Sequence, residues 1–162
     1  MTGLVSPPPG ADPGGASVHA DGWFPAVTLA SVRNTFRLGE GVVPTARLTE
    51  AVEGAMLSAF RALADWRTAR VLRGALTLTE VTELTLNNRN LAVVLWERII
   101  RCFAAAELAD LHRDLSATDD GLDRAEERAL TADDYRRMAY AAIADLQSIG
   151  GEPVQRCRVS LV

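Results

Sequence analysis

Apolar residues recur at every third or fourth position over most of the chain, which is the spacing typical of amphipathic helices. Thr28 is the predicted N-cap of a short helix that stops at Gly39. A long helix is predicted from Thr45 to about Arg73, where Gly74 ends it. We expect its apolar stripe to face the core, and the stripe comprises Leu48, Val52, Ala55, Met56, Ala59, Leu63 and Trp66.

Two further long helices follow from the same periodicity. One covers about residues 89–115, with Asn88 as its predicted cap, and it is the most apolar helix of the chain. Its wide apolar surface predicts burial between neighbouring helices. The other keeps a helical period from about residue 116 to Gly150. We interpret it as one long helix with Thr131 as a candidate break, because Thr-Ala-Asp-Asp is typical of a helix cap.

Three segments lack the helical period. Residues 1–23 are rich in Pro and Gly and predict an extended arm, because they carry too little apolar surface to offset the entropy of ordering. Residues 75–88 alternate apolar residues with Thr and Glu, which favours a strand or an extended loop. Residues 151–162 alternate polar and apolar positions like a strand, for which residues 76–86 are the candidate partner within the chain.

Together these elements predict an all-α fold in three parts. Residues 24–150 form a helical bundle of three long helices and one short helix, residues 1–23 form the extended arm, and residues 151–162 form a strand-like C-terminal tail. The tail pattern suits addition to a sheet or groove of another protein.

The charge and composition exclude several classes of protein. The net charge of -4 disfavours tight nucleic-acid binding, and all 17 basic residues are Arg. Cys102 and Cys157 lie far apart, so we expect reduced thiols. We expect no membrane contact and a cytosolic protein, because no apolar run approaches the roughly 20 residues of a membrane span and the N-terminus lacks a signal-peptide pattern.

No motif for phosphate cradling, dinucleotide binding, zinc hydrolysis or a nucleophile elbow occurs, so we expect no enzyme activity, catalytic residue, cofactor or metal. His112 beside Asp110 and Asp114 fits a base or a ligand, but a cation at a helix C-terminus is the favoured interpretation. Helix capping is likewise favoured over a cation site for the acidic residues Asp119, Asp120, Asp123, Glu126, Glu127, Asp133 and Asp134.

The aromatic residues suggest where the chain makes contacts. Trp66 and Trp96 occupy helical positions compatible with a core or an interface. Trp23 stands with Phe24 and Pro25 where the arm meets the bundle. Two hypotheses apply there: the aromatic pair staples the arm to its own bundle, or it fills a pocket of a neighbouring protein. We favour the neighbour.

The order of these features resembles the head completion/stabilisation proteins of P2-like tailed bacteriophages. The resemblance covers roughly residues 24–160 and depends on three patterns. These patterns are a helix start with Val42, Pro44, Arg47, Leu48, Ala51 and Val52, the triplet Trp96-Glu97-Arg98, and the pair Arg156-Cys157.

The resemblance implies a structural head-tail connector, or adaptor. Such a protein is expected to form a ring with itself, a dodecamer, beneath the portal protein, where it seals the DNA-filled head and docks the tail terminator or neck protein. DNA would pass through the lumen without specific binding. The expected location is the virion neck, after assembly in the host cytoplasm.

The resemblance also implies roles for the two ends of the chain. Trp23, Phe24 and Pro25 are expected to contact ring neighbours or neck proteins. The tail is expected to insert into the portal, with arginines on portal carboxylates and apolar residues in its pockets, through Val154, Arg156, Cys157, Arg158, Val159 and Leu161.

An alternative from another class is a small helical DNA-binding or DNA-packaging factor, such as a terminase-small-subunit-like protein or a regulator. Its basis is the basic segment with Arg67, Arg70 and Arg73, which has the composition of a helix-turn-helix segment. No polar, basic recognition helix follows this segment, and salt-dependent duplex binding distinguishes the two hypotheses.

Overall fold

The computed structural model describes residues 15–36, 43–116 and 130–150. This part of the chain is mostly helical, with a few very short strands, which confirms the predicted helical class. Its elements in chain order are β1 (Ser17–Val18), β2 (Val27–Thr28), α1 (Leu29–Phe36), α2 (Thr45–Leu72), the 3-10 helix η1 (Leu78–Val81), β3 (Thr85–Leu86), β4 (Arg89–Asn90), α3 (Leu91–Ser116) and α4 (Ala132–Gln147).

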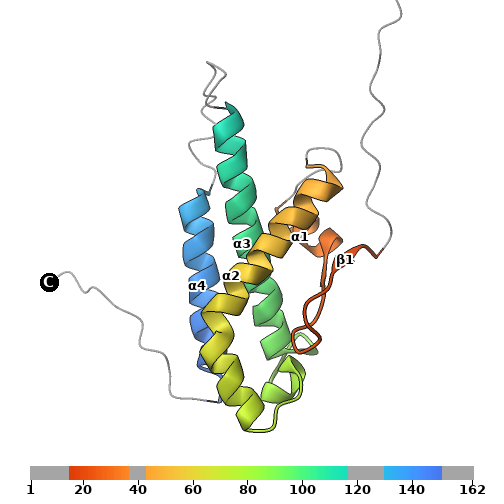
Figure 1. The fold of residues 1–162 in the computed structure, drawn as a ribbon, viewed down its shortest axis with the longest axis vertical. Coiled ribbons are helices and arrows are strands. Elements are labelled where there is room, and N and C mark those ends of the chain that lie inside the picture. Colours follow the sequence, from red (N-terminus) through yellow and green to blue (C-terminus); the bar gives the residue numbers. More distant parts are fainter. Residues whose placement is uncertain (1–14, 37–42, 117–129, 151–162) are drawn as a thin grey trace, which may run out of the picture.

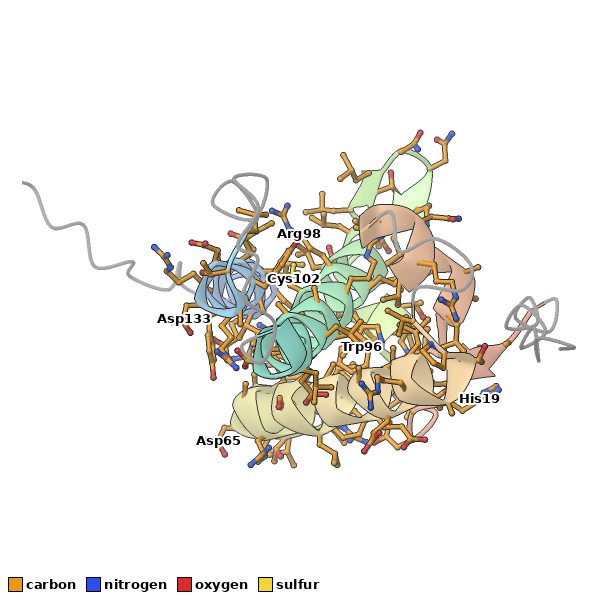
Figure 2. All side chains as sticks on the ribbon, turned by 90° about the horizontal axis from the view of Figure 1, so that it is seen from above. His19, Asp65, Trp96, Arg98, Cys102 and Asp133 are labelled. Carbon is orange, nitrogen blue, oxygen red and sulfur yellow. The ribbon has the colours of Figure 1, made fainter. Side chains whose placement is uncertain are left out.

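Helix α3 is the centre of the bundle (Figure 1). It packs extensively against both α2 and α4, whereas α2 and α4 touch each other much less. This arrangement confirms the burial between neighbours that its wide apolar surface predicts. The α2 stripe faces α3 as predicted: all of its members are buried except Trp66, which is half-buried. Figure 2 places Trp96 of α3 between α3 and α2, and the Trp96 side chain is fully buried.

The N-terminal hairpin belongs to the folded unit. Strands β1 and β2 pair antiparallel, with Ser17 opposite Thr28 and Val18 opposite Val27. Val18 and Trp23 are buried in the same core as the helices. The predicted boundary between arm and bundle at residue 23 is therefore wrong, because residues 15–23 contribute apolar side chains to that core. Residues 1–14 of the predicted arm lie outside the described residues.

The connection from α2 to α3 is a compact loop rather than one strand. It contains η1 and the hairpin of β3 and β4, in which Thr85 pairs with Asn90. Asn87 and Asn88 have φ values of 51° and 58°, as expected for the two-residue turn of a tight hairpin. Asn88 is therefore not the cap of α3. That role belongs to Asn90, whose Oδ1 accepts hydrogen bonds from the backbone N–H groups of Ala92 and Val93.

Helix α4 begins at Ala132, directly after Thr131. The Thr131 hydroxyl accepts a bond from the backbone N–H of Asp134, and the Asp134 carboxylate accepts one from the N–H of Thr131. This capping box confirms the predicted cap. The candidate break at Thr131 is thus a true helix start, and the interpretation of one long helix across it is corrected, because a capping box satisfies the backbone donors of a first turn. Residues 117–129 lie outside the described part of the chain.

Candidate interaction surface

Trp23 and Phe24 lie in an aromatic cluster that joins the N-terminal hairpin to α2 and α3. The Phe24 ring stacks on Trp96 with 4.2 Å between centroids and on Phe60 with 5.4 Å. Trp23 packs edge-on against Trp66, with 6.0 Å between the rings. Trp23 is 7% exposed and Phe24 is 1% exposed, so both rings contribute to the stability of this chain itself.

Hydrogen bonds hold the same segment in place. The indole N–H of Trp23 donates to the backbone oxygen of Ala75 at 3.1 Å, and the N–H of Leu78 donates to the backbone oxygen of Trp23 at 2.9 Å. The indole N–H of Trp96 donates to the backbone oxygen of Pro25 at 3.0 Å. The hairpin is thus joined to the α2–α3 loop and to α3 by both packing and polar contacts.

These positions correct the expectation that Trp23 and Phe24 fill a pocket of a neighbouring protein. The pocket is formed by aromatic rings of α2 and α3 in the same chain, and burial there leaves little of either ring for another subunit. The alternative of an internal staple therefore holds for both residues. Pro25 is half-buried, and its carbonyl is used within the chain.

Asp21 shapes the turn of this hairpin. Its Oδ1 accepts hydrogen bonds from the N–H groups of Trp23 and Phe24, and its other oxygen pairs with the guanidinium of Arg67. Partial burial opposes ionisation of Asp21, but the bond from Phe24, the contact with Arg67 and the bond from Trp23 outweigh it and lower its pKa. The Arg67 guanidinium lies 5.3 Å from the Trp23 ring centroid, so one arginine of α2 covers the hairpin.

Arg70, one turn after Arg67, holds the opposite end of the chain. Its guanidinium donates to the backbone oxygen of Ile149 at 2.6 Å and to that of Gly150 at 3.0 Å. These carbonyls follow α4, where helix C-terminal oxygens lack intrahelical partners. Burial and then the charge of Arg73 lower the pKa of Arg70. The side chain therefore fixes the point at which the chain continues beyond Gly150.

The predicted portal-binding tail continues from this fixed point. Its residues lie outside the described part of the chain, namely Val154, Arg156, Cys157, Arg158, Val159 and Leu161. The structure thus describes the attachment of the tail to the bundle, which we call the tail root: Arg70, Ile149 and Gly150.

The sequence interpretation missed the tail root. It grouped Arg67, Arg70 and Arg73 as a basic DNA-binding segment, whereas Arg70 is 9% exposed and Arg67 is paired with Asp21. The available signal was helical spacing, because Arg70 follows Leu63 and Trp66 on the inner side of α2. Arg67 and Arg70 are therefore held by contacts within this chain, whereas exposed Arg73 makes one long hydrogen bond, to the backbone oxygen of Gly150.

Only some of the residues considered for chemistry lie within the described part of the chain. His19 is exposed in the N-terminal hairpin, beside Ser17. Asp110 on α3 pairs with Arg136 of α4. The side chains of His112 and Asp114 lie outside the description, as does the acidic run of residues 119–127. Asp133 and Asp134 occupy the first turn of α4, where the favoured interpretation placed them.

Cys102 is a free, buried thiol on α3. Burial raises its pKa, and the nearby charges of Arg98 and Arg101 act in the opposite direction. Among residues 15–36, 43–116 and 130–150, no group of three or more His, Cys, Asp or Glu side chains is placed to hold a metal ion. None of the described helices combines the length and the apolar character that crossing a membrane requires.

The described residues form a small helical bundle that holds its N-terminal hairpin through Arg67 and the end of α4 through Arg70. A family model described as phage head completion protein (GPL) matches residues 18–159. The chain therefore belongs to the phage head completion protein (GPL) family. It is 29% identical over 140 residues to the head completion/stabilization protein of Escherichia phage P2, covering 86% of this chain and 79% of that protein. No solved structure matches the chain.

Proposed function

We propose that this head completion protein acts as a head-tail connector. Copies of the chain assemble into a ring, a dodecamer, beneath the portal protein, seal the DNA-filled head and provide the docking surface for the tail terminator or neck protein. Membership of the head completion family supports the role at the head. We place the ring at the virion neck. Assembly takes place in the host cytoplasm.

The tail root is the observation that carries the portal contact. Arg70 holds Ile149 and Gly150 against α2, so the following segment starts from a rigid point instead of a frayed helix end. A tethered segment whose first residues are fixed has less freedom to lose on binding. In the portal complex, Arg156 and Arg158 pair with carboxylates.

The apolar residues of the tail, Val154, Val159 and Leu161 together with Cys157, fill apolar pockets of the portal. Strand-like segments of this kind bind by adding to a sheet or a groove of the partner. DNA passes through the lumen without specific contacts, which agrees with the net charge of -4. The competing DNA-binding function loses its basic segment, because Arg67 and Arg70 are held in contacts within the chain.

Native mass spectrometry of the protein, alone and mixed with its portal protein, tests the proposal. We expect full-length protein to join the portal in multiple copies. A variant truncated after Gly150 keeps the bundle, as judged by circular dichroism and by a Cys102 thiol that stays unreactive without denaturant, but no longer binds the portal. Full-length protein that ignores the portal contradicts the connector role, and a truncated variant that still binds contradicts the role of the tail.

A charge-reversal pair separates specific tail contacts from general electrostatics. Arg156→Glu with Arg158→Glu is expected to weaken portal binding strongly. The matched control, Arg47→Glu with Arg61→Glu, makes the same change of net charge on exposed positions of α2 and is expected to bind like the unmodified protein. Equal losses in both variants would assign the effect to net charge alone.

A further inference from the structure

Three exposed apolar side chains gather where α2 ends. Val71 is 46% exposed, Leu72 is 82% exposed and Leu76 is 77% exposed. Arg73 lies among them, exposed, and its guanidinium has no carboxylate partner among the described residues. We call these residues, 71–73 and 76, the α2 end surface. An apolar group of this kind on a folded protein marks a contact site when a partner is available.

A second apolar surface lies on the β3–β4 hairpin. Leu84 is 61% exposed and Leu86 is 56% exposed, while Glu83 next to them is exposed and makes no ion pair within the described part of the chain. We call these residues, 83, 84 and 86, the hairpin surface. It is rigidly held, since the side-chain amide of Asn90 donates to the backbone oxygens of Thr79 and Thr82.

The two surfaces lie toward the same end of the bundle but on different sides of it. Figure 1 shows the end of α2 and the α2–α3 connection together at the lower end of the molecule. Figure 2, which looks from above, places α2 along one side and the light-green hairpin on the opposite side, with α3 between them. The two surfaces therefore lie on different sides of α3, as contacts with two different neighbours require.

We infer that the hairpin surface of one copy docks on the α2 end surface of the next copy. This inference rests on the proposed ring and assigns its subunit contact. A contact between two different surfaces is heterologous, so each copy uses its hairpin toward one neighbour and its α2 end toward the other. Repetition of such a contact closes into a ring when the rotation between copies allows it.

Charge and rigidity both favour a second copy as the occupant. The hairpin surface carries the carboxylate of Glu83 and the α2 end surface carries the guanidinium of Arg73, and neither has an oppositely charged partner among the described residues, so the two surfaces are complementary in charge as well as apolar. The α2 end surface is held by the last turn of α2 and by the bond from Trp23 to Ala75, and the hairpin surface is held by Asn90, which limits the entropy lost on docking.

Two complementary variants test the heterologous contact. Variant A carries Leu72→Asp and Leu76→Asp, and variant B carries Leu84→Asp and Leu86→Asp. Because all four positions are exposed, both variants should fold, which circular dichroism checks. We expect each variant alone to lose multimers, both free in solution and on the portal. A mixture of A and B should form one-to-one dimers, because A keeps its hairpin surface and B keeps its α2 end surface.

Charge reversal provides an independent test with built-in rescue. Arg73→Glu and Glu83→Arg should each weaken association by about tenfold, because each places like charges together. The double variant restores the pair and should recover association. For variants A and B, the matched control is Leu57→Asp. Leu57 is 61% exposed on α2 but belongs to neither surface, so this variant should assemble normally.

The outcomes separate this inference from the proposed function. Wild-type protein that forms no multimer, free or on the portal, overturns the ring and the contact together. Wild-type multimers with unchanged assembly of A and B overturn the contact alone. If variant A or variant B still multimerises but no longer binds the portal, the contact between copies is also overturned, because the mutated surface then belongs to the portal contact.

Discussion

Gly54 of α2 faces the carboxylate of Glu107 on α3 so closely that a Cβ atom at residue 54 would lie 2.7 Å from Oε2 and 2.8 Å from Cδ. The absence of a side chain at Gly54 therefore lets a carboxylate lie between two packed helices. Burial and then the charge of Glu50 raise the pKa of Glu107, and the charge of Arg136 opposes them.

A double-mutant cycle measures this contact. Gly54→Ala should stabilise the protein by up to about 1 kcal/mol in a Glu107→Ala background, because alanine favours the helix. In the wild-type background the gain should be smaller by about 0.5 kcal/mol or more, since the Glu107 side chain must move away. Urea unfolding of the four proteins gives the coupling. Equal effects of Gly54→Ala in both backgrounds would show that the two residues do not interact.

The raised pKa of Glu107 predicts a pH dependence of stability. Well below the ordinary value of 4.5, the carboxyl is protonated in both folded and unfolded chains. As pH rises from there to the raised pKa, the unfolded chain releases its proton first, so the folded protein loses stability. Glu107→Gln should therefore gain stability relative to wild type between pH 4 and pH 7, measured by urea unfolding. Glu53→Gln, on the exposed side of α2, serves as control.

Trp23 should stabilise the isolated chain. Trp23→Ala removes a buried ring and its bond to Ala75, and the loss of unfolding free energy should be about 3–5 kcal/mol. His19→Ala, an exposed change in the same hairpin, should stay within about 0.5 kcal/mol of wild type. Thermal unfolding at a concentration where the protein is monomeric makes the comparison. A negligible effect of Trp23→Ala there would return this residue to the neighbour-contact hypothesis.

Arg70 and Arg73 should differ sharply in their contribution to stability. Arg70→Gln leaves the oxygens of Ile149 and Gly150 without their charged donor and should cost about 1–3 kcal/mol. Arg73→Gln removes one long bond of 3.4 Å on the surface and should change stability by less than about 0.5 kcal/mol. Hydrogen exchange should also become faster at the end of α4 in Arg70→Gln alone. Similar exchange in the two variants would contradict a fixed tail root.

The lowered pKa of Asp21 predicts a pH dependence of stability opposite to that of Glu107. Because its folded-state pKa lies below the ordinary value of 3.8, the stability it provides is fully present above pH 3.8 and is lost as pH falls through the lowered value. Asp21→Asn should therefore be less stable than wild type at pH 7, and the difference should shrink at pH 2–3. The matched control is Asp65→Asn on the exposed side of α2. A difference that does not change with pH would exclude ionisation as its origin.

Helix positions were predictable because a buried stripe repeats every three to four residues. That pattern predicted the start of α2 at Thr45, and the capping sequence Thr-Ala-Asp-Asp predicted the cap of α4 at Thr131. The cap of α3 was assigned to Asn88 instead of Asn90, since two asparagines near a helix start look alike in sequence. Only the hairpin register shows that the first is needed in the turn.

The contacts that hold the two ends of the folded chain could not be predicted from local sequence patterns. Proline and glycine content suggested that the residues before Trp23 have no place in the core, yet the Trp23 indole bonds to the α2–α3 loop and the Asp21 carboxylate pairs with α2. Arg67 and Arg70 look like surface charge in a periodic sequence. Their partners lie 46 and about 80 residues away, a separation at which sequence spacing carries no information.

Arg67 and Arg70, on consecutive turns of α2, grip opposite ends of the folded chain. A pull on the tail at Gly150 therefore reaches the last turn of α2 through Arg70 and does not act on the last turn of α4 alone. From there it passes to the N-terminal hairpin through Arg67 and Asp21. Helix α2 therefore links the two ends mechanically: tension applied at one end of the folded chain is shared with the opposite end before any core helix has to separate.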